Sequence, residues 1–227
     1  MKRIGLALLI AGSLASAAHA ADPAFEDHSV QLGGHIYGGD WEFFVGGGVA
    51  VMDCNADKQP DIFLAGGANP SALYVNEGGF NFALSEGPGV TDVTGAYPLD
   101  IDADGWTDLY VLRVGPDRLL RGGPDCAFED VTDAWGLPQA DRWSTAFTGW
   151  WEGDGRPTLA VGHYVDRADP EGPFEACDAN TLLRPEADGW RDPMNANNNL
   201  GGGGHRRKGS RSTRKGNRRS TRKGNRR

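Results

Sequence analysis

The chain has 227 residues, with 31 acidic residues against 23 Lys or Arg and a formal net charge of −8. This charge is unevenly distributed, because residues 201–227 hold twelve Lys or Arg and no acid, while residues 22–200 hold nine basic residues and all 31 acids. Residues 22–200 therefore carry a net charge of −22. So acidic a segment attracts divalent cations and repels the phosphates of nucleic acid, and we expect no specific nucleic-acid partner for it.

The first twenty residues read as a secretory signal peptide. Lys2 and Arg3 precede a short apolar core, and Ala18-His19-Ala20 has the A-x-A form of a cleavage site. The apolar core is too short to cross a bilayer, and no later segment approaches the ~20 apolar residues that a membrane span needs. A buried N-terminal helix is the alternative. We predict a signal peptide at 1–20 and a protein that is secreted or periplasmic, without a membrane span.

Two short acidic loops, 47 residues apart, carry the same pattern of oxygen-bearing side chains, and each runs into an apolar segment. Carboxylates so close repel one another, and a folded chain tolerates them best with a cation between them. Ca²⁺ suits such a set because it accepts roughly 6–8 oxygen ligands at flexible geometry. We therefore predict two Ca²⁺ sites with side-chain ligands at positions 1, 3, 5 and 9 and a backbone carbonyl at position 7: Asp53, Asn55, Asp57, Gln59 and Asp61, and then Asp100, Asp102, Asp104, Trp106 and Asp108.

Position 6 distinguishes the two loops. Gly105 permits a sharp turn in the second loop, whereas Lys58 makes the same turn more costly in the first. We expect the first loop to bind calcium more weakly. An eroded third copy lies 50 residues further along and keeps two of the four acids, which predicts an empty site; it comprises Trp150, Glu152, Asp154, Gly155 and Thr158.

An EF-hand loop begins in the same way, but it requires a bidentate Glu at position 12 and a helix after it. Position 12 of the second loop is Val111, and the segment from Leu109 to Val114 is β-branched and aromatic and too short for a helix. These features predict calcium loops between strands.

Alignment on the loops reveals a repeating unit of about four short strands. One strand precedes the loop, one follows it, one lies at Leu73-Tyr74 or Leu119-Leu120, and one lies at a Phe-x-x motif, as at Phe128 and Phe25. Four strands in roughly 40–50 residues make one propeller blade. No segment shows a sustained 3.6-residue apolar period, so we predict almost no helix. The predicted fold is all-β, with about three blades of four antiparallel strands at 24–190.

These motifs resemble a known family. The pattern D-x-[DN]-x-D-G-x-x-D, the Leu-Tyr-x-Asn-x-Gly motif at 73–78 and the F-x-D-V-T-x-x-x-G-L motif at 128–137 are similar to FG-GAP/VCBS repeats. Such repeats build integrin-alpha-type β-propellers and the related CRTAC and UnbV (ASPIC) proteins. The resemblance covers about Ala24 to Gly189. It implies that the acidic loops bind Ca²⁺ and that the propeller serves adhesion or display, with an unknown protein or glycan as ligand.

Propellers of this kind resemble closed rings of about seven blades, and this chain has room for three to three and a half. An open arc leaves edge strands unpaired, so we expect either a fragment or a chain that a partner completes.

The segment 191–227 is expected to be a disordered, low-complexity tail. Its last sixteen residues are the same eight-residue unit written twice, and no apolar residue follows Leu200. Twelve cations predict a salt-sensitive contact with polyanions. A frame change or a truncated reading frame is the alternative origin of this tail.

The three cysteines allow at most one disulfide within the chain. For an exported chain we favour a bond between Cys126 and Cys177, with unpaired thiols as the alternative.

Nothing in the sequence forms a recognisable catalytic constellation, since both G-x-S-x-G and H-E-x-x-H are missing. We expect the histidines to be surface or turn residues. The tryptophans are expected to pack in the core rather than to stack on sugars; they are Trp41, Trp106, Trp143, Trp150 and Trp151. The prediction is a binding module and not an enzyme. The alternatives are a propeller-scaffold lyase or hydrolase of polysaccharides, with its site in further blades, and a polyanion binder that acts through the tail.

Overall fold

The computed structural model describes residues 22–44, 46–153, 155–170, 176–187 and 189–193. The predicted signal peptide, Asp154 of the third loop and the tail from residue 194 onward lie outside the described residues. The predicted start of the tail at residue 191 is wrong, because Arg191 ends strand β12 (Gly189–Arg191) and Asp192 is buried. Within these ranges the chain forms strands, and its helical segments are three short 3₁₀ turns: η1 Ser29–Leu32, η2 Trp41–Phe43 and η3 Pro124–Cys126. The described residues contain no helix that is long and apolar enough to cross a membrane. The all-β prediction is confirmed.

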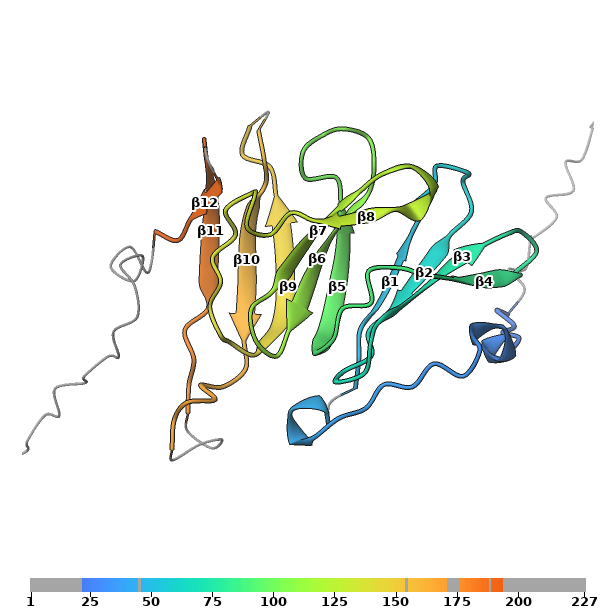
Figure 1. Cartoon of the computed structure of the whole chain (residues 1–227), viewed down its shortest axis with the longest axis horizontal. Helices are drawn as coiled ribbons and strands as arrows, with labels where there is room; N and C mark the ends of the chain where they lie inside the picture. The colour runs from blue at the N-terminus through green and yellow to red at the C-terminus, as the bar shows by residue number, and fades with distance from the viewer. Residues whose placement is uncertain (1–21, 45, 154, 171–175, 188, 194–227) are drawn as a thin grey trace, which may run out of the picture.

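The strands form three antiparallel sheets of four, each in simple sequence order (Figure 1). The first sheet consists of β1 Val49–Met52, β2 Asp61–Leu64, β3 Ala72–Asn76 and β4 Phe82–Ser85. The second consists of β5 Val93–Leu99, β6 Asp108–Arg113, β7 Arg118–Gly122 and β8 Phe128–Asp130. The third consists of β9 Ser144–Trp150, β10 Thr158–His163, β11 Thr181–Glu186 and β12 Gly189–Arg191. Each sheet is therefore one propeller-like blade, as the repeat predicts.

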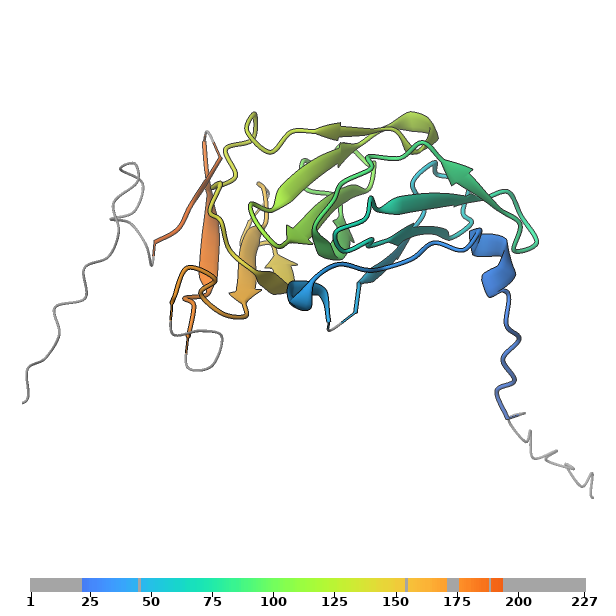
Figure 2. The same cartoon turned by 60° about the horizontal axis from the view of Figure 1, so that its bottom comes forward.

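The three blades stand side by side along the molecule, with the second in the middle (Figures 1 and 2). Their first strands approach one another, since β1 contacts β5 and β5 contacts β9. The approach of β1 to β5 is close enough that a Cβ built on Gly48 would lie 2.7 Å from the Cα of Gly95. A larger residue at Gly48 would push the first two blades apart.

Most of the core consists of two apolar layers, one on each face of the middle blade, and a smaller third cluster comprises Phe43, Val114 and Trp143. Leu109 and Val111 of β6 pack into the layer shared with the first blade, whereas Tyr110 and Leu112 pack into the layer shared with the third. Because β6 is covered on both faces, it has no polar side, and its sequence is a continuous apolar run. On β1, one face is open instead, and Val49 and Val51 are 60% and 57% exposed.

The tryptophans do not all lie in the core. Trp143 is fully buried, as predicted, but Trp41, Trp150 and Trp151 are exposed, so the prediction is wrong for these three.

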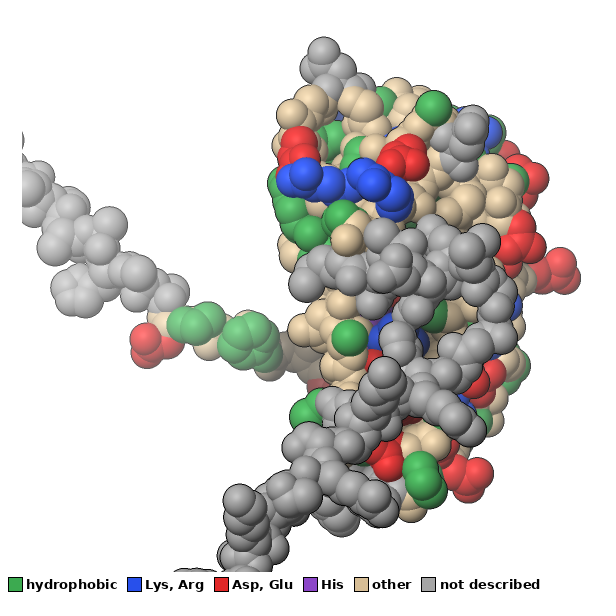
Figure 3. Space-filling view, turned by 90° about the vertical axis from the view of Figure 1, so that its left-hand side faces the viewer, with side chains coloured by type: hydrophobic (Ala, Val, Ile, Leu, Met, Phe, Trp, Pro, Cys, Tyr) green, Lys and Arg blue, Asp and Glu red, His purple; other side chains and the backbone are tan. Residues whose placement is uncertain are grey.

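The exposed end of the third blade carries paired charges, with Arg184 bonded to Glu152 and Arg191 to Glu186. Figure 3 shows basic and acidic side chains adjoining on this end of the molecule.

The strand predicted around Phe25 is absent from the described residues. Ala24 to Asp27 form no strand, and the Phe25 side chain is 96% exposed. Its sequence counterpart at Phe128 does form β8, which pairs with β7. The Phe-x-x motif alone does not determine whether a strand forms, because a strand also needs a neighbouring strand with free hydrogen-bonding groups.

The disulfide prediction is wrong in its partner. Cys126 is bonded to Cys54, with Cα atoms 4.8 Å apart, and Cys177 is an exposed free cysteine. The bond joins the first acidic loop to η3, the turn that precedes β8, and so it links the first blade to the second. Sequence spacing could not reveal this pair, because it depends on which turns face each other across two blades.

Candidate metal centre

The second acidic loop connects β5 to β6 and is held to its blade by its last acid. Asp108 is fully buried. Its Oδ2 accepts a hydrogen bond from the backbone N–H of Ile101 at 2.7 Å, and its Oδ1 accepts one from Gly122, the last residue of β7, at 2.8 Å. Burial raises the pKa of Asp108 to about 6, although these two bonds act in the opposite direction. The carboxylate therefore ties the loop and two strands together.

The acids at the start of the second loop are turned inward by its own backbone. The N–H of Gly105 donates to Asp100 Oδ2 at 3.1 Å, and the N–H of Trp106 donates to Asp104 Oδ1 at 2.9 Å. The N–H of Asp104 likewise points to Asp102 Oδ1 at 3.3 Å. The chain thus wraps around its own carboxylates, which is the shape that a cation-binding turn requires.

Three acids of this loop come together. One oxygen each from Asp100, Asp102 and Asp108 lie within 4.8 Å of one another. The Oδ1 atom of Asp100 is also buried without a hydrogen-bond partner among the described residues. A buried carboxylate oxygen without a partner is costly. Hard oxygen donors at this separation fit a Ca²⁺ ion, which would supply that missing partner.

One protein cation already lies on this loop. Arg121 of β7 donates from Nε to Asp102 Oδ2 at 2.8 Å and from Nη2 to Asp104 Oδ2 at 2.6 Å. Its guanidinium relieves part of the repulsion between these two acids, and their charges raise the pKa of Arg121. Asp104 is directed to Arg121 and is not among the three acids that converge.

The first acidic loop repeats this backbone pattern. The N–H of Lys58 donates to Asp53 Oδ2 at 2.8 Å, the N–H of Gln59 to Asp57 Oδ1 at 2.8 Å, and the N–H of Asp57 to Asn55 Oδ1 at 3.1 Å. The matching positions of both loops also have a positive φ: Ala56 at 63° and Lys58 at 69°, against Ala103 at 60° and Gly105 at 90°. The two loops therefore share one conformation, and Lys58 adopts the turn that glycine adopts more readily.

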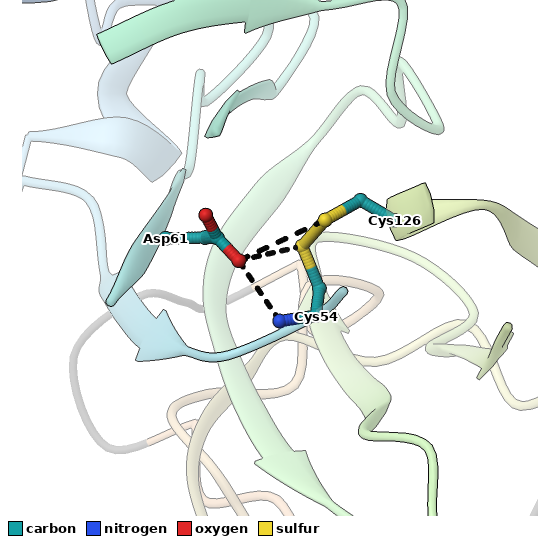
Figure 4. Close-up of side chains that lie close together, drawn as sticks. All are labelled: Cys54, Asp61 and Cys126. Carbon is teal, nitrogen blue, oxygen red and sulfur yellow. Dashed lines mark hydrogen bonds between the residues drawn. A yellow bond between two sulfur atoms is a disulfide. The ribbon is translucent and has the colours of Figure 1, made fainter. Parts of the chain in front are cut away.

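The last acid of the first loop has a different neighbour. Asp61 is fully buried, and it accepts backbone N–H bonds from Cys54 and from Asn76, both at 2.9 Å. Its Oδ2 lies 3.0 Å from the Cys54 sulfur and 3.7 Å from the Cys126 sulfur (Figure 4). Among the described residues, Asp61 is grouped with these two cysteines and not with the other acids of its loop. The first loop is accordingly the weaker metal candidate.

The third loop departs further from the pattern. The position of the buried Asp is taken by Thr158, which is fully buried and whose hydroxyl has no partner among the described residues. Glu152 bonds instead to Trp150 Nε1 and to Arg184, both at 3.3 Å. The prediction that this loop holds no calcium remains a prediction.

Comparison with known families finds a repeat that spans the first and second acidic loops. Residues 53–111 match the FG-GAP-like repeat. This stretch runs from the first acid of the first loop to position 12 of the second, and it supports an FG-GAP repeat protein with propeller-like blades. No curated protein matches the chain.

The structure also assembles a polar cluster that the sequence reasoning missed. Ser144 Oγ lies 3.0 Å from Asp117 Oδ2 and 3.2 Å from His163 Nδ1, and His163 Nε2 lies 2.8 Å from Thr181 Oγ1. His163 is half-buried in β10, so the expectation of a surface or turn histidine is wrong for this residue. Burial, which is the largest cause, lowers the pKa of His163 to about 4, and it raises the pKa of Asp117 to about 6.

This cluster does not have the geometry of a catalytic triad. In a triad the carboxylate orients the histidine, and the serine is free to attack. Here the carboxylate of Asp117 accepts from Ser144 itself and from Tyr110, and Ser144 is only 1% exposed. The cluster ties the second blade to the third, since Tyr110 lies on β6, Ser144 on β9 and His163 on β10.

Proposed function

We propose that this protein is an exported, calcium-binding FG-GAP/VCBS repeat protein of the integrin-alpha-like, CRTAC and UnbV (ASPIC) type. It acts as a binding or adhesion module, and its calcium is structural. The observation that carries the proposal is the buried Oδ1 of Asp100, which has no partner among the described residues and lies beside Asp102 and Asp108.

Asp100, Asp102 and Asp108 would hold the ion, and bound Ca²⁺ supplies positive charge that offsets their repulsion. Asp108 keeps the loop attached to β7 through its bond from Gly122. Arg121 contributes charge to Asp102 and Asp104 through its two ion pairs. The backbone donors of the loop hold the carboxylates in place before any ion arrives, so little reorganisation is needed.

Export is supported by two features. The N-terminal segment has the form of a signal peptide, and the disulfide between Cys54 and Cys126 is a bond that persists in oxidising compartments. Binding rather than catalysis is supported by the buried position of Ser144 in the cluster closest to a catalytic arrangement. The ligand class is a protein or a glycan.

Thermal melting of the chain without residues 1–20, in calcium and in a chelator, tests the metal. We expect calcium to raise the melting temperature. Asp100→Asn should remove most of the gain and Asp104→Ala part of it, whereas Asp133→Asn, at an exposed turn, should leave it intact. An equal melting temperature in calcium and chelator contradicts the proposal.

A further inference from the structure

A pocket of about 320 Å³ opens between the second and third blades, next to the Asp117–Ser144–His163 cluster. We call it the inter-blade pocket. Its walls come from the strands β6, β9, β10 and β11, together with the segments that carry Asp117 and Pro138 to Arg142 and with Asp192, which follows β12. Packed protein interiors contain few voids larger than a water molecule. This pocket falls within the range of ~300–1,000 Å³ that small-ligand sites occupy.

The walls of the pocket combine an apolar side with groups that both donate and accept hydrogen bonds. Val161 and Leu183 supply buried apolar surface, while Asp117, His163 and Thr181 supply a carboxylate, an imidazole and a hydroxyl. Both ring nitrogens of His163 are engaged within the cluster, by Ser144 and by Thr181, so His163 holds the Thr181 hydroxyl in place while that hydroxyl remains able to accept from a ligand. A ligand with both hydroxyl donors and apolar C–H surface matches this lining.

The charges around the pocket disfavour an anion. Arg142 lines the pocket, but its Nη1 is bonded to Asp178 at 2.5 Å and to the carbonyl of Ala179 at 2.8 Å. Two acids, Asp117 and Asp192, line the same pocket, and each residue is 8% exposed. A phosphate, sulfate or uronate would meet these acids while the nearby guanidinium is already paired.

We propose that the inter-blade pocket binds one residue of a neutral sugar through hydroxyl bonds to Asp117 and Thr181, with the sugar's C–H surface against Val161 and Leu183. The inference rests on the proposed function as a binding module and names its ligand class. The sugar would compete with water for these groups, and the apolar wall would exclude water from one side of the ring. The internal bonds of the cluster hold its side chains in fixed orientations, which reduces the ordering cost of binding.

Isothermal titration of the calcium-loaded chain without residues 1–20, using glucose, galactose, mannose and glucuronate as separate probes, tests this inference. We expect saturable binding of at least one neutral hexose and weaker or no binding of glucuronate. Ala140→Trp, at an exposed position on the pocket wall, should weaken binding at least about tenfold, which corresponds to about 1.4 kcal/mol. Ala134→Trp, exposed and outside the wall, should leave binding unchanged.

A second pair of variants leaves the entrance of the pocket unaltered. Thr181→Val removes a hydroxyl at nearly constant shape and should weaken hexose binding, whereas Thr148→Val, on the exposed face of β9, should not. Absence of saturable heat with all three hexoses, equal binding by Ala140→Trp, or tighter binding of glucuronate would overturn the inference. A calcium-dependent melting temperature with no hexose binding refutes the sugar pocket alone, whereas hexose binding without a calcium effect refutes the metal alone.

Discussion

Asp117 and Asn180 occupy the same position in successive blades. Each lies just before the third strand of its blade, and each side chain accepts a hydrogen bond from the backbone N–H of the residue that ends the second strand. Arg113 donates to Asp117 Oδ1 at 2.9 Å, and His163 donates to Asn180 Oδ1 at 3.0 Å. An amide oxygen thus suffices to close this turn. The charge of Asp117 is needed only for its other oxygen, which accepts from Tyr110 and Ser144.

The shifted pKa values of Asp117 and His163 predict how the stability of the protein depends on pH. Burial raises the pKa of Asp117 to about 6, so the folded protein holds this proton more tightly than the unfolded chain does. The resulting contribution to the free energy of unfolding is complete below about pH 4 and is lost as the pH rises through 6. Burial and the neighbouring Arg142 lower the pKa of His163 to about 4, so its contribution is complete above about 6.5 and is lost as the pH falls through 4. The two slopes oppose each other between pH 4 and 6.

We therefore expect Asp117→Asn to make the free energy of unfolding rise more steeply with pH from 4 to 6 than in the unaltered protein. His163→Gln should make it rise less steeply or fall. Urea denaturation at several pH values measures both profiles. Variants with profiles parallel to the parent would show that neither group has a shifted pKa. Asp178 and Asp192 also act on His163, in the opposite direction to Arg142, and they remain unchanged in both variants.

The repeat made much of the fold predictable from sequence. Position 9 of each acidic loop begins a strand, and the Leu-Tyr and Leu-Leu motifs form β3 and β7, because the same local pattern recurs and fixes the same turns. The Asp117–Ser144–His163 cluster had no such local signal, since its members lie on three separate segments that meet only when two blades pack. One clue was available: Asp117 and Asn180 each stand two residues before an apolar pair, at Leu119-Leu120 and Leu182-Leu183.

The buried acids at position 9 should be needed for folding whether or not calcium is present. Asp108→Asn and Asp61→Asn each replace one of two accepting oxygens by an NH₂ group that faces a backbone donor. We expect each variant to lose about 1–3 kcal/mol of unfolding free energy, measured by urea denaturation in a chelator. Asp133→Asn, at an exposed position, is the control and should be neutral. Loss of stability only in calcium would mean that these acids act through the ion alone.

Replacing Lys58, the turn residue of the first loop, by glycine should raise the free energy of unfolding. Lys58 has a φ of 69°, which a side chain disfavours, whereas Gly105 adopts 90° at the matching position. Lys58→Gly should therefore stabilise the protein by about 1 kcal/mol in urea denaturation. Lys58→Ala removes the charge but keeps the Cβ, so it should give no such gain. Equal gains from both variants would attribute the effect to charge.

The disulfide should be a major contribution to stability. It closes a sequence separation of 72 residues between two blades, and a long closed loop restricts the unfolded chain strongly. The double variant Cys54→Ala with Cys126→Ala should lose about 2–4 kcal/mol of unfolding free energy, and Cys177→Ala should be neutral. Thiol counting on the denatured, unreduced protein should find a single thiol. Reactive Cys126 in that assay would reject the pairing.

Arg121 and calcium should compete for the second loop. The guanidinium bonds to Asp102 and Asp104, and Asp102 is one of the three acids that converge with Asp100 and Asp108. Without Arg121, repulsion among these acids is unrelieved in the absence of an ion, so Arg121→Ala should melt at a lower temperature than the parent in chelator. Its gain in melting temperature on adding calcium should exceed the parent's gain, because the ion then supplies all the compensating charge.

The matched control for this variant is Arg118→Ala. Arg118 lies on the same strand and pairs with Asp130, outside the acidic loop, so its removal should leave the calcium gain unchanged while altering overall charge equally. Calcium titration followed by the melting temperature measures both variants. A smaller calcium gain in Arg121→Ala than in the parent would mean that the arginine holds Asp102 in position for the ion, and competition between the two cations would be refuted.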